Sequence, residues 1–155
     1  MRNLLLLSTL LITGAWAQDR PELNGVWQLD PAHCAFSEIR LKSQTLSIKQ
    51  EDESIKVEDT ATEESGKERK AEFECNTNGR ECNVKLNGQA AKLSAYYNGA
   101  VLVVIEQRRG NDSTIRKRLK TSEDGKTLTI EVANLARPGL KPDSLVYTKQ
   151  GSAAK

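Results

Sequence analysis

Residues 71–86 read AEFECNTNGRECNVKL and contain the pattern that decides the fold. Apolar and polar side chains alternate on both sides of Asn78-Gly79, as they do in β-strands with one buried face. Asn-Gly is also the preferred centre of a two-residue type I′ hairpin. Pairing outward from this turn places both cysteines on the apolar face. The predicted pairs are Thr77 with Arg80, Asn76 with Glu81, Cys75 with Cys82, Phe73 with Val84 and Ala71 with Leu86.

The facing cysteines predict a disulfide. Directly opposed residues at a hydrogen-bonded position lie ~5.5 Å apart at Cα, which a disulfide tolerates. A bridge from Cys34 to either one would close a longer loop, worth ~4 kcal/mol against ~2.5 kcal/mol for the hairpin bridge, provided that the fold brings Cys34 near. A zinc site from His33 and the three cysteines has a permissible ligand set, but its spacing matches no familiar zinc motif. We therefore predict a bridge between Cys75 and Cys82, Cys34 as the spare thiol, and no metal.

Outside this hairpin the dominant period is again two, and Asn-Gly, Asp-Gly and Pro separate the apolar segments. Only residues 36–42 leave room for a helix. The run 101–105 is apolar on both faces, which is typical of a central strand. Strands are expected near residues 24–29, 46–49, 55–57, 71–75, 82–86, 93–97, 101–105, 115–119, 127–132 and 145–147.

These closely spaced strands predict an all-β fold. With no helices to cover its faces, such a sheet must close into a barrel or fold into a sandwich to bury its apolar face and remove its edges. Successive hairpins make neighbours in sequence neighbours in space. We therefore predict an antiparallel up-and-down meander of about 8–10 strands closed into a single barrel, with a β-sandwich as the alternative.

The N-terminus predicts export. Arg2 precedes an apolar run that ends at Trp16, and Ala15-Trp16-Ala17 has the small-x-small form of a signal-peptidase site. The run is shorter than the ~20 residues of a membrane span. We therefore assign residues 1–17 to a cleaved signal peptide and 18–155 to one lipocalin-like β-barrel domain. The product is expected in the periplasm or outside the cell, without a membrane span.

Charge and motifs exclude several functions. The chain has 23 Lys and Arg against 21 Asp and Glu, too small an excess to indicate a nucleic-acid partner. His33 and Cys34 are adjacent, so on a strand they would point to opposite faces and would not form a thiolate–imidazole pair. No phosphate loop, nucleophile elbow or zinc-protease helix is present. We predict no catalytic residues, no cofactor and no enzyme activity.

The segment Gly25-Val26-Trp27 resembles the Gly-x-Trp opening of lipocalins, avidins and related calycin barrels. The order Gly25 to Pro31, then Asn78 to Glu81, then Asp124 to Thr129 is similar to small exported bacterial proteins described as lipocalin-like, which are mostly uncharacterised. The resemblance implies a barrel whose tryptophan closes one end. In lipocalins a late-strand arginine packs across this tryptophan; the last expected strand here carries Lys149 but no arginine.

Candidate ligand contacts come from apolar positions and from one basic cluster. Aromatic residues make up 5% of the chain, so few bulky side chains are available to fill the barrel. On strand 115–119, Arg116 and Arg118 share a cationic face with Lys120. This stripe is a solvated outer face or, as in fatty-acid-binding barrels, an interior contact for a ligand carboxylate. The tentative ligand-binding residues are Trp27, Phe73, Val84, Leu93, Tyr97, Leu102, Arg116 and Arg118.

Two functions fit this barrel. The first is an exported, monomeric lipocalin-like protein that binds a small apolar or amphipathic molecule, for which an internal cavity of about 300 Å³ or more with an open mouth is expected. The alternative is an inhibitor or interaction module that acts on an exported hydrolase. That alternative predicts a filled core and an exposed apolar loop such as residues 135–140.

Overall fold

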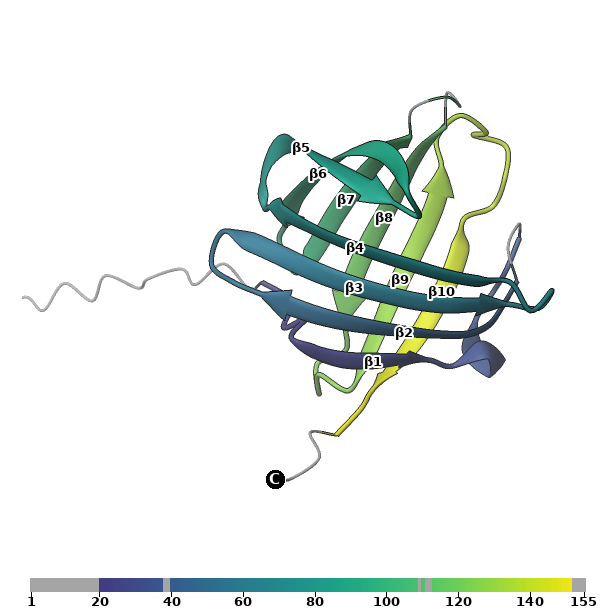
Figure 1. The fold of residues 1–155 in the computed structure, drawn as a ribbon. Coiled ribbons are helices and arrows are strands. Elements are labelled where there is room, and N and C mark those ends of the chain that lie inside the picture. The colour runs from purple at the N-terminus through teal and green to yellow at the C-terminus, as the bar shows by residue number, and fades with distance from the viewer. Residues whose placement is uncertain (1–19, 38–39, 109, 111–112, 152–155) are drawn as a thin grey trace, which may run out of the picture.

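A computed structural model describes residues 20–37, 40–108, 110 and 113–151. In this part of the chain ten antiparallel strands form a closed up-and-down barrel (Figure 1). Each strand pairs with its neighbours in sequence, and β1 pairs with β10 to close the sheet. The strands are β1 Gly25–Leu29, β2 Leu41–Gln50, β3 Ser54–Glu63, β4 Glu68–Asn76, β5 Asn78–Leu86, β6 Gln89–Asn98, β7 Val101–Arg108, β8 Thr114–Thr121, β9 Thr127–Asn134 and β10 Asp143–Lys149. The predicted all-β barrel is confirmed, and the β-sandwich alternative is wrong.

The predicted helix at residues 36–42 is wrong for the residues that the structure describes there. Leu41 and Lys42 open β2, and a short 3-10 helix occurs earlier, at Pro31–His33. The pairing of β2 with β3 shifts register between Leu41 and Ser43. This irregularity breaks the two-residue period at the start of β2, so the alternation that marks a strand is absent from the sequence there. Residues 38–39 and the predicted signal peptide lie outside the described residues.

The β4–β5 hairpin has the predicted register but a different turn. Ala71 lies opposite Leu86, and Cys75 and Cys82 form a disulfide with a Cα–Cα distance of 5.8 Å. A type I′ turn requires positive φ at both central residues. Among the described non-glycine residues only Asn87 has a positive φ, so the type I′ prediction at Asn78-Gly79 is wrong. The turn with both angles positive is Asn87-Gly88, between β5 and β6.

The topology gives the barrel two different ends. One end holds the turns β2–β3, β4–β5, β6–β7 and β8–β9, and we call it the closed end. The chain segment before β1 packs there: Leu23 is fully buried, and its backbone N–H donates to Gln50 Oε1 at 2.9 Å. The other end holds the remaining connections, including residues 135–142, and we call it the mouth.

Trp27 fills the barrel interior near the closed end. Its side chain is completely buried, and its indole N–H donates to the backbone oxygen of Leu23 at 2.8 Å. Lys149 Nζ lies 5.2 Å from the centre of the ring. Lys149 thus occupies the position across the tryptophan where the lipocalin resemblance implied an arginine. The hydrogen bond to Leu23 satisfies the one polar group of Trp27, so the closed end buries the whole indole without an unpaired donor.

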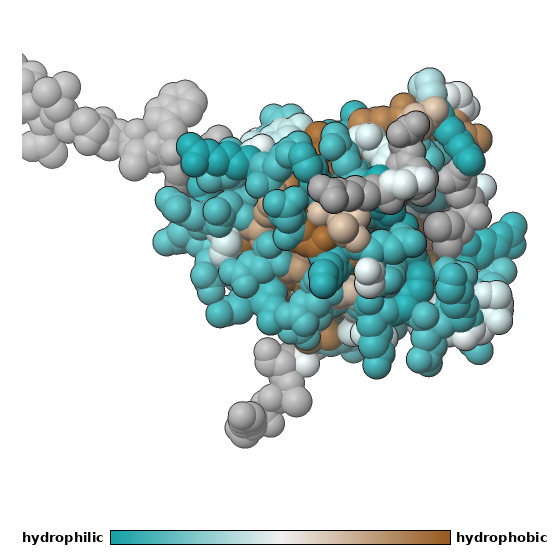
Figure 2. All heavy atoms as spheres, turned by 45° about the horizontal axis from the view of Figure 1, so that its top comes forward, coloured by the Kyte–Doolittle hydropathy of each residue, from teal (hydrophilic) through white to brown (hydrophobic). Residues whose placement is uncertain are grey.

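The outer surface is mainly hydrophilic. Figure 2 shows polar and charged side chains over most of the visible face, with small hydrophobic patches between them. Val103 on β7 is an outward-facing exception that is nonetheless buried. Tyr96 of β6 and Arg118 of β8 lie opposite it on the neighbouring strands. Within the described residues, no helix has the length and apolar character that a membrane span requires.

Candidate ligand-binding cavity

The barrel encloses a cavity of about 260 Å³ that reaches the mouth. Side chains from β2 through β10 line it, because alternate residues of each strand point inward. Residues of the mouth connections also contribute, among them Asn87 and Leu140. The volume is slightly below the ~300 Å³ at which ligand pockets generally begin. The apolar lining residues include Leu41, Leu46, Ile48, Ile55, Val57, Phe73, Leu86, Leu93, Leu102, Val104, Leu119 and Ile130.

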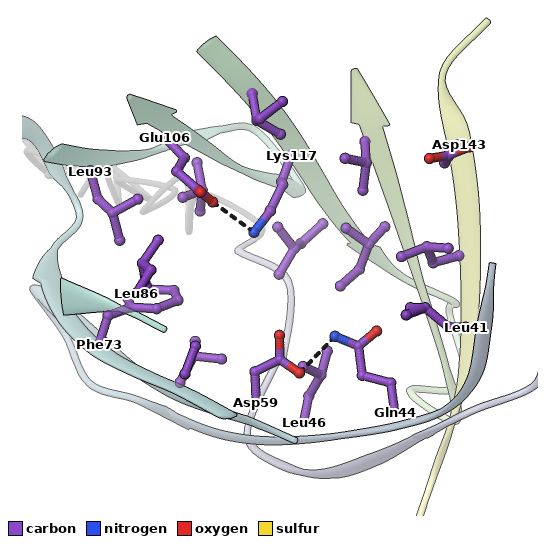
Figure 3. A pocket seen from close by; sticks show the side chains of 18 of the residues that line it. Leu41, Gln44, Leu46, Asp59, Phe73, Leu86, Leu93, Glu106, Lys117 and Asp143 are labelled. Carbon is purple, nitrogen blue, oxygen red and sulfur yellow. Dashed lines mark hydrogen bonds and ion pairs between the residues drawn. The ribbon is translucent and has the colours of Figure 1, made fainter. Parts of the chain in front are cut away.

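One wall of the cavity, on β7 and β8, carries a buried carboxylate between two cations. Only 1% of the Glu106 side chain is exposed. One of its oxygens accepts from Arg108 Nε. The other accepts from Lys117 Nζ at 3.1 Å (Figure 3). Burial raises the pKa of the Glu106 carboxyl, but the charge of Lys117 and the hydrogen bond from Arg108 outweigh it, so the pKa is lowered overall. Glu106 is therefore ionised at neutral pH.

The facing wall carries a hydrogen-bonded chain from β10 through β2 to β3. The Tyr147 hydroxyl donates to Gln44 Oε1 at 2.7 Å, and Gln44 Nε2 donates to Asp59 Oδ1 at 2.7 Å. Figure 3 shows Gln44 and Asp59 side by side on the cavity wall. Burial, and secondly the charge of Asp59, raise the pKa of Tyr147 well above its ordinary value. The phenol therefore remains protonated and can act as the donor of this chain.

The mouth of the cavity is polar. Its lining includes Ser37, Asn87, Asn134 and Lys141. Asp143 belongs to the same rim, where it accepts hydrogen bonds from both the backbone N–H and the hydroxyl of Ser37. These contacts join the segment before β2 to the start of β10. The cavity thus has a polar entrance, an apolar remainder and two polar clusters on facing walls. We call these clusters the β7–β8 station (Glu106, Arg108 and Lys117) and the β2–β3 station (Gln44, Asp59 and Tyr147).

The predicted ligand contacts separate into four locations: the cavity, a hollow between β4 and β5, the closed end and the outer face. Phe73, Leu93 and Leu102 line the cavity, as expected for contact residues. Val84 packs against the core but lines a shallow hollow between β4 and β5 rather than the cavity. Trp27 and Tyr97 are absent from the cavity lining.

Tyr97 contributes to the closed end instead. Its hydroxyl accepts a hydrogen bond from Gln50 Nε2 at 2.9 Å, and Arg20 packs over its ring at 4.8 Å. Gln50 also holds the backbone of Leu23 through its other amide atom. Tyr97 therefore helps to fasten the N-terminal segment across the barrel.

The cationic stripe lies outside the barrel. Arg116 and Arg118 are 39% and 45% exposed, and each lies within 4 Å of Glu131 on the neighbouring strand. The interior face of β8 carries Ile115, Lys117 and Leu119, all of which line the cavity. Of the two positions considered for the stripe, the solvated outer face is the one that the structure shows. The interior alternative, and with it ligand contact by Arg116 and Arg118, is wrong, because the alternation places Lys117 inside and both arginines outside.

The remaining cysteine and the histidine do not form a reactive pair. Cys34 is free, as predicted, and its sulfur accepts from the backbone N–H of Val146 at 3.2 Å. Burial raises the pKa of this thiol, which disfavours the thiolate. His33 Nδ1 instead lies 2.7 Å from Asp30 Oδ2 at the surface. Among the described residues no group of three or more metal-ligating side chains comes together.

Sequence reasoning missed the polar residues inside the cavity, although a signal for them exists. Glu106 continues the inward face of Leu102 and Val104, and Asp59 continues that of Ile55 and Val57. Charged side chains in register with an apolar face would have identified both. The densest charge along the chain instead surrounds Arg116 and Arg118, which lie on the outer face.

Comparison with known proteins gives the fold and leaves the family open. No family model and no curated protein sequence matches the chain. Among solved structures, a REP1-NXSQ fatty acid transporter is 11% identical, with a TM-score of 0.62 over 84% of this chain and 97% of its own. Fatty-acid-binding protein 1 of Echinococcus granulosus is 10% identical, with a TM-score of 0.57 over 83% and 98%. Secretory abundant heat soluble protein 4 of Ramazzottius varieornatus is 12% identical, with a TM-score of 0.60 over 83% and 94%.

At these identities the likeness establishes architecture alone. The chain shares its closed β-barrel fold with this fatty acid transporter and this fatty-acid-binding protein.

Proposed function

We propose that this protein binds one small apolar or amphipathic molecule in its barrel cavity and carries out no reaction on it. The observation that carries the proposal is the mouth-connected cavity itself, half of whose lining residues are leucine, isoleucine or valine. A protein core is normally filled to crystal-like density, so an apolar space of this size calls for an occupant. The fold-sharing proteins named as a fatty acid transporter and a fatty-acid-binding protein support the same class of ligand.

We also propose that the protein is exported after removal of residues 1–17 and acts as a monomer. The disulfide between Cys75 and Cys82 supports an oxidising compartment, because such bonds are rare in the cytosol.

The alternative, an interaction module, has one observation in its favour. Leu135 and Leu140, in the connection between β9 and β10, are 43% and 45% exposed. Leu140 also lines the cavity at its mouth. Because a cavity rim accounts for an exposed leucine without a protein partner, the binding function explains more of the molecule.

The test uses protein from its own host and a fluorescent probe. We expect native mass spectrometry to find a one-to-one complex with a small molecule, and Nile red to bind the emptied protein. Val132→Trp should weaken probe binding about tenfold, because Val132 lines the cavity. Val146→Trp is the matched control, since Val146 is also half-buried on a late strand but does not line the cavity.

Circular dichroism checks that both variants fold. Absence of a carried molecule, together with equal probe binding by the wild type and Val132→Trp, would contradict the binding function.

A further inference from the structure

We propose that the cavity selects a single-chain amphiphile with a protonated amine as its head group, held by Asp59, and discriminates against free carboxylates. This inference rests on the proposed binding function and names the ligand class. The two polar stations inside the cavity differ in what they offer a ligand, and this difference carries the inference.

The β7–β8 station already contains a carboxylate that offsets part of its positive charge. Lys117 and Arg108 are the cations on this wall, and Glu106 lies between them with one oxygen bonded to each. A ligand carboxylate that approached Lys117 would lie close to the Glu106 carboxylate. Like charges at such distances repel strongly in a poorly hydrated interior. The wall whose cations could bind a ligand carboxylate therefore already contains the Glu106 carboxylate.

The β2–β3 station ends in an acceptor. An ionised carboxylate only accepts hydrogen bonds, so the amide nitrogen of Gln44 must face Asp59 and its oxygen must face Tyr147. Both bonds therefore run in the same direction, from Tyr147 through Gln44 to Asp59. Bonds aligned in this way strengthen one another and leave the acceptor at the end of the chain.

Asp59 has capacity left for a ligand. Gln44 occupies Oδ1, and Figure 3 shows the second oxygen directed into the cavity. Within the described part of the chain, no lysine or arginine forms an ion pair with Asp59. Arg69, two residues nearer the mouth on the neighbouring strand, also lines the cavity, but it pairs with Glu63 at 3.4 Å. A half-buried carboxylate without a paired cation attracts a charged donor such as an ammonium group.

The apolar surface gives the ligand its orientation. Val57 and Ile55 follow Asp59 on the inward face of β3 toward the closed end, and Ile48 lies opposite Val57 on β2. An alkyl chain attached to the ammonium would lie along these side chains. The head group would then sit at mid-depth, with the tail directed toward Trp27.

The experiment compares three ligands of equal chain length that differ only in their head group: dodecylamine, dodecanol and dodecanoic acid. Each displaces the neutral probe Nile red at pH 7, below its micelle concentration. We expect the amine to bind about tenfold more tightly than the acid, with the alcohol between them. Asp59→Asn should remove about tenfold of the amine affinity and leave the alcohol nearly unchanged.

Glu58→Gln is the control. It removes the same charge from the residue immediately before Asp59, whose side chain is exposed on the outer face. It should leave all three affinities unchanged. Tightest binding by the acid, or an amine affinity unaffected by Asp59→Asn, would overturn the inference while leaving the binding function intact. Should Asp59→Asn fail to fold, the ranking on the wild type decides alone. If the wild type binds neither the probe nor any of the three compounds, the proposed function fails as well.

Discussion

The two ends of the barrel differ in what their interior side chains do. At the closed end, Leu23 and Trp27 are fully buried, and the indole N–H has its partner. Toward the mouth, Glu106 and Asp59 bring charge into the interior, where burial is costly unless each charge is paired. The closed end therefore stabilises the fold by apolar burial, whereas the mid-cavity depends on how its charges are paired and, under the proposed function, offers polar contacts to a ligand. Substitutions at the two ends should separate these properties.

The largest effect is expected for Trp27→Ala at the closed end. Loss of a fully buried indole should lower the free energy of unfolding by about 3–5 kcal/mol, measured by urea denaturation. Nile red affinity of the folded fraction should change little, because Trp27 does not line the cavity. Val26→Ala, at an exposed neighbouring position, should cost less than about 0.5 kcal/mol. If Trp27→Ala lost much Nile red affinity but little stability, the closed end would not have the purely stabilising role assigned to it.

The disulfide near the closed end gives the next effect. Replacing both Cys75 and Cys82 by serine should lower the free energy of unfolding by about 2.5 kcal/mol, because the unfolded chain is no longer closed into a short loop. Ladder pairing between β4 and β5 is limited to Ala71 with Leu86 among the described residues, so the bridge is the main link at the other end of this hairpin. Reduced wild type should unfold at the same urea midpoint as the double variant. A different midpoint would mean that the serine side chains, and not the loss of the bridge, change the stability.

Glu106→Gln tests the charged wall of the cavity. At pH 7 we expect a loss of about 1–2 kcal/mol, since Lys117 and Arg108 lose their charged acceptor but remain a third exposed to screening solvent. The lowered pKa of Glu106 means that its contribution to stability is present above the ordinary value of 4.5 and is lost as pH falls below it. The difference between variant and wild type should therefore shrink in urea titrations repeated from pH 7 to pH 3. A constant difference would show that Glu106 acts by packing alone.

The smallest effect is expected outside the barrel. Arg118→Gln removes an exposed charge 3.8 Å from Glu131 and should change the free energy of unfolding by less than about 0.5 kcal/mol. Dodecanoic acid should bind equally well to the variant and the wild type. A clear loss of acid binding would place Arg118 in the ligand site and contradict the assignment of the stripe to the outer face.

The fold was predictable because its signals are local. Alternation and turn residues located the strands, and counting from one hairpin tip placed Cys75 opposite Cys82 even though the turn itself has another geometry. The start of β2 was missed because the register shift after Leu41 removes the alternation there.

The candidate site was only partly predictable. Phe73, Leu93 and Leu102 were found because any inward apolar residue of a small barrel is close to its axis. The contact between Gln44 and Tyr147 joins residues 103 positions apart, and no local pattern predicts which polar side chains meet across the interior. Whether the space is filled or open also depends on how all the inward side chains pack together.

The pairing of β1 with β10 determines how the molecule can be tethered. Gly25 begins β1 and Lys149 ends β10 at the same end of the barrel, and Gln150 N–H still bonds to the Val26 carbonyl. The described chain therefore begins and ends beside Trp27 at the closed end, on the side away from the mouth. A surface linker inserted before Gly25 or after Gln150 would hold the barrel with its entrance facing outward, so that under the proposed function immobilised protein should exchange ligand as freely as protein in solution.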